Sequence, residues 1–211
     1  MSSPLTTAAR AGAGAADARH VPDARAALWL VRHAPTPDNH GDVIMGQRDP
    51  ASTGEGLREA VGLLADVTIA QAVSSDARRA SATAAAIAPD APLRLDERLR
   101  ERHLGDWEGQ DKRIVRAEHP AAFTDGGAVR LDAVLPGAES LDDLMRRVHA
   151  ALIELAGAPR PLLVVAHNGS LRVAMVLLGL TDFATASAAT LPHLSPIAAD
   201  LAQLREPASV V

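Results

Sequence analysis

Two short runs of the chain, residues 27–31 (ALWLV) and 161–166 (PLLVVA), consist of apolar residues alone. Both are apolar at consecutive rather than alternate positions, which is typical of strands buried on both faces of a sheet. Residues 71–74 and 93–95 form shorter runs that we also interpret as strands. Because stretches with helical spacing separate these runs, the pattern predicts a layered α/β domain.

Apolar residues spaced three and four positions apart predict the helices. The segment 57–64 has this spacing, and the Ser-Thr-Gly-Glu at 52–55 before it resembles a capping box. The segment 141–156 has the strongest helical pattern, and 171–180 is apolar on every side, so we expect it to be packed on more than one face. We also expect helices over 78–88 and 110–118. The segment 190–204 is partly strand-like, but its two prolines leave its register open.

Composition narrows the classes of function. The chain has 211 residues, 47% of them apolar, which suits one domain with a sizeable core. It has no cysteine, so a disulfide framework and a thiolate nucleophile or metal ligand are excluded. A formal net charge of −5 and 2% aromatic residues argue against a nucleic-acid partner. No apolar run approaches the ~18 residues of a membrane span, so we expect no membrane partner and a cytoplasmic protein.

The first 25 residues differ from the rest. They are rich in Ala and Gly, and charged residues interrupt them before any apolar stretch of signal-peptide length is reached. We predict a disordered N-terminal tail over residues 1–25 and one domain over residues 26–211.

A histidine follows each of the two apolar strands, His33 after the first and His167 after the second. Because ligands of open α/β sheets bind beyond the carboxyl ends of the strands, we expect both imidazoles to face one crevice. Arg78 and Arg79 follow the strand at 71–74 at the same edge. Ser170 lies at the start of the apolar helix, where main-chain N–H groups favour an anion. Two histidines, arginines and a helix N-terminus together suit a phosphate dianion.

These residues also have ordinary explanations. A histidine after a strand commonly caps a loop, and an arginine there commonly pairs with a carboxylate or with solvent. Two histidines could also bind a metal, but the neighbouring guanidinium groups would repel a divalent cation, and no H-x-x-x-H or Asp-rich cluster occurs. The joint occurrence of these residues at comparable strand ends favours the anion site.

Six strings in order carry a resemblance to a known family. Residues 30–36 (LVRHAPT), with Asn39 after them, are similar to the L-V-R-H-G-E-T signature of the histidine phosphatase, or phosphoglycerate mutase-like, superfamily. The other strings are GQRD at 46–49, SSDARRA at 74–80 leading to Thr-Ala at 83–84, LRE at 99–101 with GDWEG at 105–109, PGAES at 136–140 and VVAHNG at 164–169. The resemblance covers about residues 28–180. It implies a three-layer α/β/α sandwich with a mostly parallel central sheet.

The resemblance also implies a role for each matching residue. His33 would be the nucleophile and form a phosphohistidine that water later hydrolyses. Glu101 would act as general acid and then as general base, with Glu108 as the rival carboxylate. The phosphoryl group would be clamped by Arg32, Arg79 and His167, with Asn39, Thr36 and Asn168 as further substrate-binding residues.

Neighbouring residues compete for some of these roles. The family spacing R-A-x-x-T-A selects Arg79 over Arg78. His103, His119 and His193 are interpreted as ordinary surface or loop residues. Ala-Pro at 34–35 replaces the usual Gly-Glu, which stiffens the loop and removes a carboxylate.

Three functions remain open at this point. We expect a metal-independent phosphomonoester hydrolase without a cofactor, acting on a small phosphorylated metabolite as a monomer or homodimer. Arg102 and Lys112 resemble residues that hold the substrate carboxylate in cofactor-dependent phosphoglycerate mutases, so a mutase is the first alternative. The segment 123–130 lacks the paired arginines of mutases. A catalytically weak phosphate-binding module is the second alternative.

Overall fold

Five strands form one sheet in the order β3-β2-β4-β1-β5. The computed structural model describes residues 27–207, and the predicted tail at 1–25 lies outside them. β5 is antiparallel to β1 and every other pair is parallel, as the resemblance implied. The strands are β1 (Leu28–Arg32), β2 (Gln71–Ser74), β3 (Leu93–Leu95), β4 (Leu162–Ala166) and β5 (Ile197–Ala199).

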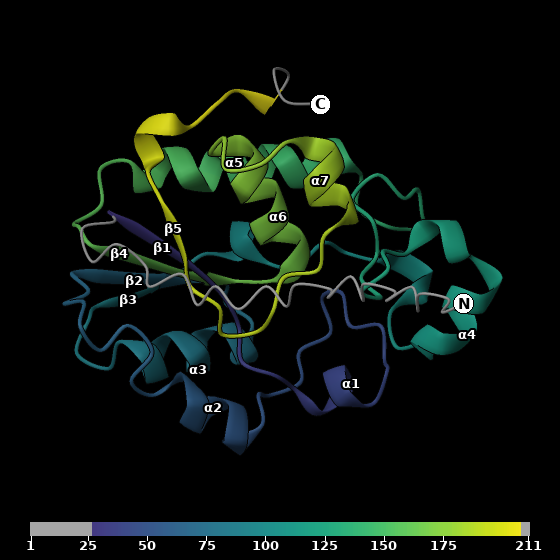
Figure 1. Ribbon diagram of the computed structural model, residues 1–211, viewed down its shortest axis with the longest axis horizontal. Coiled ribbons are helices and arrows are strands. Elements are labelled where there is room, and N and C mark those ends of the chain that lie inside the picture. Colours follow the sequence, from purple (N-terminus) through teal and green to yellow (C-terminus); the bar gives the residue numbers. More distant parts are fainter. Residues whose placement is uncertain (1–26, 208–211) are drawn as a thin grey trace, which may run out of the picture.

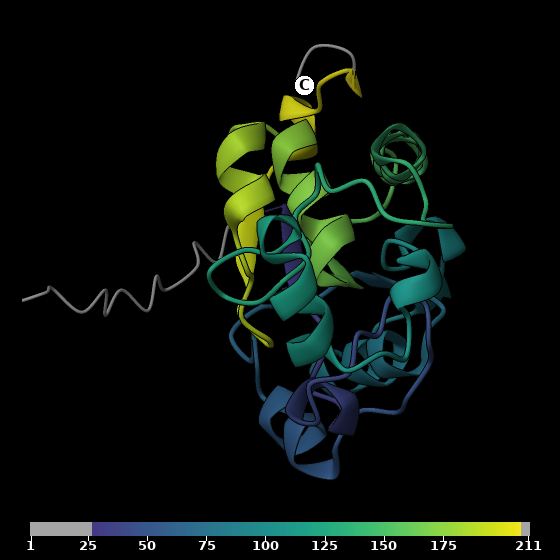
Figure 2. The same cartoon turned by 90° about the vertical axis from the view of Figure 1, so that its right-hand side faces the viewer.

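Helices cover both faces of the sheet (Figures 1 and 2). Two pack on one face, α2 (Gly54–Ala60) and α3 (Arg78–Ile87). Three lie on the other, α5 (Leu141–Leu155), α6 (Asn168–Leu177) and α7 (Phe183–Ala188). All helices within residues 27–207 are too short or too polar to cross a membrane.

The sheet divides the core in two. Successive residues of β1 point to opposite faces, so Leu28 and Leu30 pack with α5 and α6, whereas Trp29 and Val31 pack with α2 and α3. Residues of β4 divide in the same way. This double burial explains the uninterrupted apolar runs, and the predicted three-layer α/β/α sandwich is confirmed.

Two long excursions lie beyond the carboxyl ends of the strands. Residues 33–53 include α1 (Pro37–His40), and residues 96–140 include α4 (Lys112–Glu118). Both lie to the right of the sheet in Figure 1. A third apolar cluster joins them through Ile44 of the first excursion and Leu104, Trp107 and Phe123 of the second. The two excursions therefore form a shared wall at the edge where the histidines were expected.

Several helix ends differ from the predicted ones. α2 ends at Ala60, because Gly62 and Leu64 have positive φ angles of 83° and 64°. Its N-cap is Thr53, whose hydroxyl accepts from the Gly56 N–H, so the predicted capping box does not form. α4 begins at residue 112 because Asp111 caps it. α6 begins at Asn168, three residues earlier than expected.

Candidate active site

His33 is the first residue after β1, and its side chain is 2% exposed. Its main-chain N–H continues the parallel ladder by donating to the Ala166 carbonyl at 3.0 Å. Its ring Nδ1 lies 2.7 Å from the Ala34 carbonyl. Because a carbonyl can only accept, Nδ1 carries the hydrogen and Nε2 keeps a free electron pair. Burial, and then Arg79 and Arg32, hold the imidazole pKa well below its usual range, so the ring is neutral and nucleophilic at neutral pH.

His167 follows β4 and meets His33 as the strand ends predicted. The two ring centroids are 5.1 Å apart. Neither ring nitrogen of the fully buried His167 has a hydrogen-bond partner within residues 27–207. Burial, and then Arg79, lower the pKa of His167 well below its usual range. Because buried polar atoms are normally paired, these orphaned nitrogens indicate a place for a ligand.

Arg32 and Arg79 add two buried cations. Arg32, the last residue of β1, donates a hydrogen bond from Nη1 to the Leu191 carbonyl. Arg79 lies in the first turn of α3 and donates to the carbonyls of Arg48 at 2.6 Å and Gly46 at 3.1 Å. In both residues the buried Nε has no partner in the described part of the chain. Burial lowers both guanidinium pKa values, to about 10 for Arg32, so both stay charged at neutral pH. Two cations with N–H groups to spare suit an anion.

Glu101 lies against the N-terminus of α6. Its Oε1 accepts from the Gly169 N–H at 2.9 Å and from the Arg102 N–H at 2.8 Å. A Cβ at position 169 would lie 2.4 Å from that oxygen, so glycine is what lets the carboxylate approach the helix. Glu101 lines the same cavity as Arg32, His33 and Arg79. The carboxylate and the buried histidine therefore face the same cavity.

The rival carboxylate, Glu108, has a different place. Its Oε1 accepts from the main-chain N–H groups of Gln47 and Leu104, both at 2.9 Å. It thereby ties the first excursion to the second. Glu108 does not line the cavity. The geometry favours Glu101 for proton transfer.

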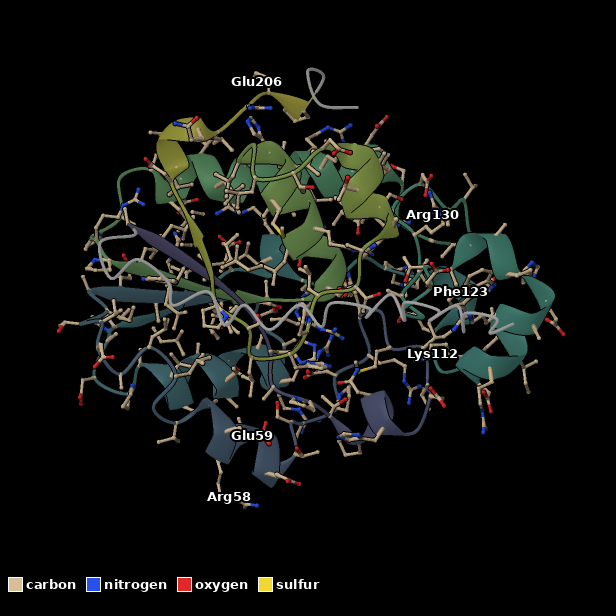
Figure 3. The ribbon with its side chains drawn as sticks, viewed as in Figure 1. Arg58, Glu59, Lys112, Phe123, Arg130 and Glu206 are labelled. Atoms are coloured by element: carbon tan, nitrogen blue, oxygen red, sulfur yellow. The ribbon has the colours of Figure 1, made fainter. Side chains whose placement is uncertain are left out.

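The cavity extends from His33 between the two excursions. Beyond the histidine, apolar and cationic residues both line it. The apolar residues are Val43, Ile44, Met45, Leu104, Phe123, Val129 and Leu131, and the cationic ones are Arg102, Lys112, Arg130 and Arg172. In the view of Figure 3, Arg130, Phe123 and Lys112 follow one another from top to bottom on the α4 side of the molecule.

Three predicted substrate-binding residues are placed as follows. Asn39 lines the cavity, and its Oδ1 accepts from the Thr36 N–H at 2.9 Å, which leaves the amide Nδ2 as a donor. Thr36 is fully buried, caps α1 and is not among the lining residues, so its visible role is to orient Asn39. Asn168 lines the cavity, and its Oδ1 accepts from the Leu191 N–H.

The two residues predicted to hold a carboxylate differ in their availability. Arg102 is buried, and its guanidinium donates to the carbonyls of Glu139, Arg130, Leu131 and Ala133. One of its five N–H groups is left. Lys112 pairs with Asp42 at 3.2 Å and keeps two N–H groups. Lys112 is thus free to meet a substrate, whereas Arg102 is engaged with the chain.

Sequence reasoning did not single out Arg172 or recognise the place of His193. Arg172 of α6 is buried in the cavity wall and donates to the carbonyls of Asn168, Ala186, Ser187, Ala189 and Val129. His193 is a loop residue, as expected, but its ring lies 5.1 Å from the His33 ring. An arginine within an apolar helix was the one available signal for Arg172. Arg78, exposed and bound to Asp49, is a surface charge as predicted.

The alternative that the two histidines bind a metal ion can be tested on the side chains around them. Residues 27–207 contain no group of three or more His, Asp or Glu side chains arranged to hold a metal ion. Two cations, Arg79 and Arg32, act on both histidines instead, and they lower both imidazole pKa values. The arrangement can bind and polarise an anion, and it brings together a neutral imidazole and a carboxylate.

Comparison with known proteins identifies the family to which this chain is similar. Residues 28–196 match the histidine phosphatase superfamily (branch 1). Glucosyl-3-phosphoglycerate phosphatase of Mycolicibacterium vanbaalenii is 37% identical over 170 residues, which are 72% of this chain and 74% of that protein. A probable phosphoglycerate mutase of Salmonella choleraesuis is 36% identical over 145 residues, covering 65% of this chain and 67% of that protein.

A solved structure shows the same likeness in three dimensions. The native structure of a mycobacterial glucosyl-3-phosphoglycerate phosphatase has a TM-score of 0.67 and 30% identity, covering 80% of this chain and 86% of that one. The resemblance stated from the sequence motifs is thereby confirmed. The chain belongs to the histidine phosphatase superfamily and is a phosphomonoester hydrolase that acts on a small phosphorylated metabolite.

Proposed function

We propose that this hydrolase works through a phosphohistidine on His33, without a metal ion. In the first step, the Nε2 electron pair attacks phosphorus and the bond to the ester oxygen breaks. Glu101 gives a proton to that leaving oxygen. In the second step, Glu101 takes a proton from water, the water oxygen attacks phosphorus, and the bond to Nε2 breaks to release inorganic phosphate. The observation that carries the proposal is the group of buried, unpartnered nitrogens around His33.

The remaining residues stabilise charge. Arg32 and Arg79 would place guanidinium N–H groups on the phosphoryl oxygens, whose charge spreads over all three during transfer. His167 would add a neutral donor, because burial keeps its pKa low. Asn39 would contribute its amide Nδ2. Phosphoryl transfer depends mainly on positioning and on charge stabilisation, and this cationic pocket supplies both.

The substrate class we propose is a phosphorylated organic acid. Lys112 and Arg130 line the cavity beyond His33, and each keeps N–H groups beyond its ion pair with Asp42 or Asp132. A substrate carboxylate that extends into this part of the cavity would find cationic partners there. The similar proteins are named for a glucosyl-3-phosphoglycerate and for phosphoglycerate, which both contain a carboxylate. The cytoplasmic location and the monomeric or homodimeric state remain predictions.

The proposal is tested by hydrolysis of p-nitrophenyl phosphate with and without excess EDTA. We expect release of p-nitrophenol at the same rate in both, with acid-labile phosphate on the protein during turnover. Release that EDTA stops would indicate a metallohydrolase. No release, together with binding of inorganic phosphate, would indicate the binding module. Interconversion of 2- and 3-phosphoglycerate faster than their hydrolysis would indicate a mutase.

Lys112→Gln tests the substrate class. We expect KM for phosphoserine or 3-phosphoglycerate to rise about tenfold, the loss expected for a hydrogen bond to a charged group. KM for p-nitrophenyl phosphate, which has no carboxylate, should stay within a factor of two. Arg113→Gln is the matched control, since Arg113 is the next residue and pairs with Asp111 at the surface. An equal rise in KM for both substrate types would contradict a carboxylate contact at Lys112.

A further inference from the structure

The peptide unit between His33 and Ala34 is held at both ends by side chains from distant parts of the chain. Its carbonyl accepts from Nδ1 of His193 at 2.7 Å. Its N–H donates to Oγ1 of Thr83 at 2.9 Å. Because a peptide unit is planar and rigid, two such bonds fix its orientation. His193 lies 160 residues further along the chain, in the loop between α7 and β5.

This peptide unit determines what the His33 ring can do. The next carbonyl, that of Ala34, accepts from Nδ1 of His33 and thereby keeps the hydrogen off Nε2. Rotation of the 33–34 unit changes ψ of His33 and φ of Ala34, two of the torsions that set the His33 ring against the Ala34 carbonyl, so it would disturb the bond that selects the tautomer. Orientation of the 33–34 unit therefore bears on both the direction and the tautomer of the nucleophile.

His193 also contacts the nucleophile directly. Its ring packs edge-on against the His33 ring, with an angle of 67° between the planes. The next residue, Leu194, donates its main-chain N–H to the Arg32 carbonyl at 3.1 Å. Burial, and then Arg32, lower the pKa of His193 to about 4, so it is neutral at working pH and adds no charge beside His33.

We propose that His193 is a positioning residue for the reaction of His33: its Nδ1–H fixes the His33 carbonyl and so keeps Nε2 unprotonated and aimed at the phosphoryl group. The proposal rests on the proposed role of His33 as nucleophile. It gives a function to a residue that sequence reasoning treated as an ordinary loop histidine.

Three substitutions separate the hydrogen bond from the bulk of the ring. The amide nitrogen of asparagine can take the place of Nδ1, whereas that of glutamine reaches the place of Nε2, and alanine has neither. With p-nitrophenyl phosphate, we expect kcat to fall about tenfold in His193→Ala, with KM within a factor of two, because the groups that bind phosphate are intact. His193→Asn should recover kcat to within about threefold of the wild type, and His193→Gln should not. His119→Ala, at an exposed histidine, should leave the rate unchanged.

A second measurement does not depend on turnover. The nitrogen-15 shifts of His33 should show hydrogen on Nδ1 only in the wild type and in His193→Asn, and a mixture of tautomers in His193→Ala. Unchanged kcat and shifts in His193→Ala would overturn the proposal. So would an Asn variant as slow as the Gln variant. If the wild type hydrolyses no phosphomonoester yet the shifts respond as described, the proposed function fails while the positioning by His193 stands.

Discussion

His33→Ala is expected to lower hydrolysis of p-nitrophenyl phosphate by roughly 10⁴-fold or more, the scale on which loss of a covalent nucleophile is felt. It should also abolish acid-labile labelling by a phosphorus-32 donor, because the proposed phosphohistidine forms on the Nε2 atom that this substitution removes. The His33 side chain makes a single hydrogen bond within the described residues, to Ala34, so the fold should survive. Rates and quenched labelling are measured together, with thermal unfolding as the check on structure.

The comparison variant is His119→Ala, which removes an exposed imidazole from the far end of α4. It should keep both the rate and the label. Labelling that persists in His33→Ala would transfer the nucleophile to another residue, and His167, 5.1 Å away with both ring nitrogens unpartnered among the described residues, is the first candidate.

Glu101→Gln should slow alkyl phosphates far more than aryl phosphates. General acid catalysis contributes roughly 10²- to 10⁴-fold, and a poor leaving group needs the proton most. We expect a loss of about 10³-fold for phosphoserine and less than about tenfold for p-nitrophenyl phosphate. The glutamine carbonyl can still accept from the Gly169 N–H, so the position of the side chain is retained. The measurement is kcat for a series of esters that differ in leaving-group pKa.

Glu108→Gln is the matched control for this series. Glu108 accepts two main-chain N–H groups and does not line the cavity, so its loss should lower stability without changing the ratio of alkyl to aryl rates. A ratio that stays constant in Glu101→Gln would assign Glu101 a structural role only. A ratio that shifts in Glu108→Gln instead would make it the proton donor.

The sheet could be predicted because its strands are buried on both faces. Residues 28–31 and 162–166 are apolar at consecutive positions, as strands buried on both faces require. The end of α2 could not be predicted, because its apolar spacing continues to residue 64 while positive φ angles at 62 and 64 stop the helix. The start of α6 could not be predicted, because Asn-Gly-Ser at 168–170 are residue types with low helix propensity.

The residues of the site also divide into those that could be predicted from the sequence and those that could not. Groups fixed by strand ends, such as His33 and His167, could be brought together from topology alone. His193 could not, because its place depends on the path of a loop with two prolines. The engagement of Arg102 was equally hidden, since main-chain carbonyls are its acceptors and no sequence pattern records them.

The guanidinium groups of Arg102 and Arg172 donate to main-chain carbonyls rather than to a carboxylate, and this affects the electrostatics of the cavity. Together they hold the segment 129–133 in place by donating to four of its carbonyls. Neither forms an ion pair within residues 27–207, but Glu101 and Asp132 lie close enough to raise both guanidinium pKa values against the effect of burial. This wall of the cavity therefore holds two buried guanidinium groups that favour an anion, even before any ligand enters. Because these guanidinium groups are buried, dissolved salt screens their attraction for an anion much less than it would at the surface.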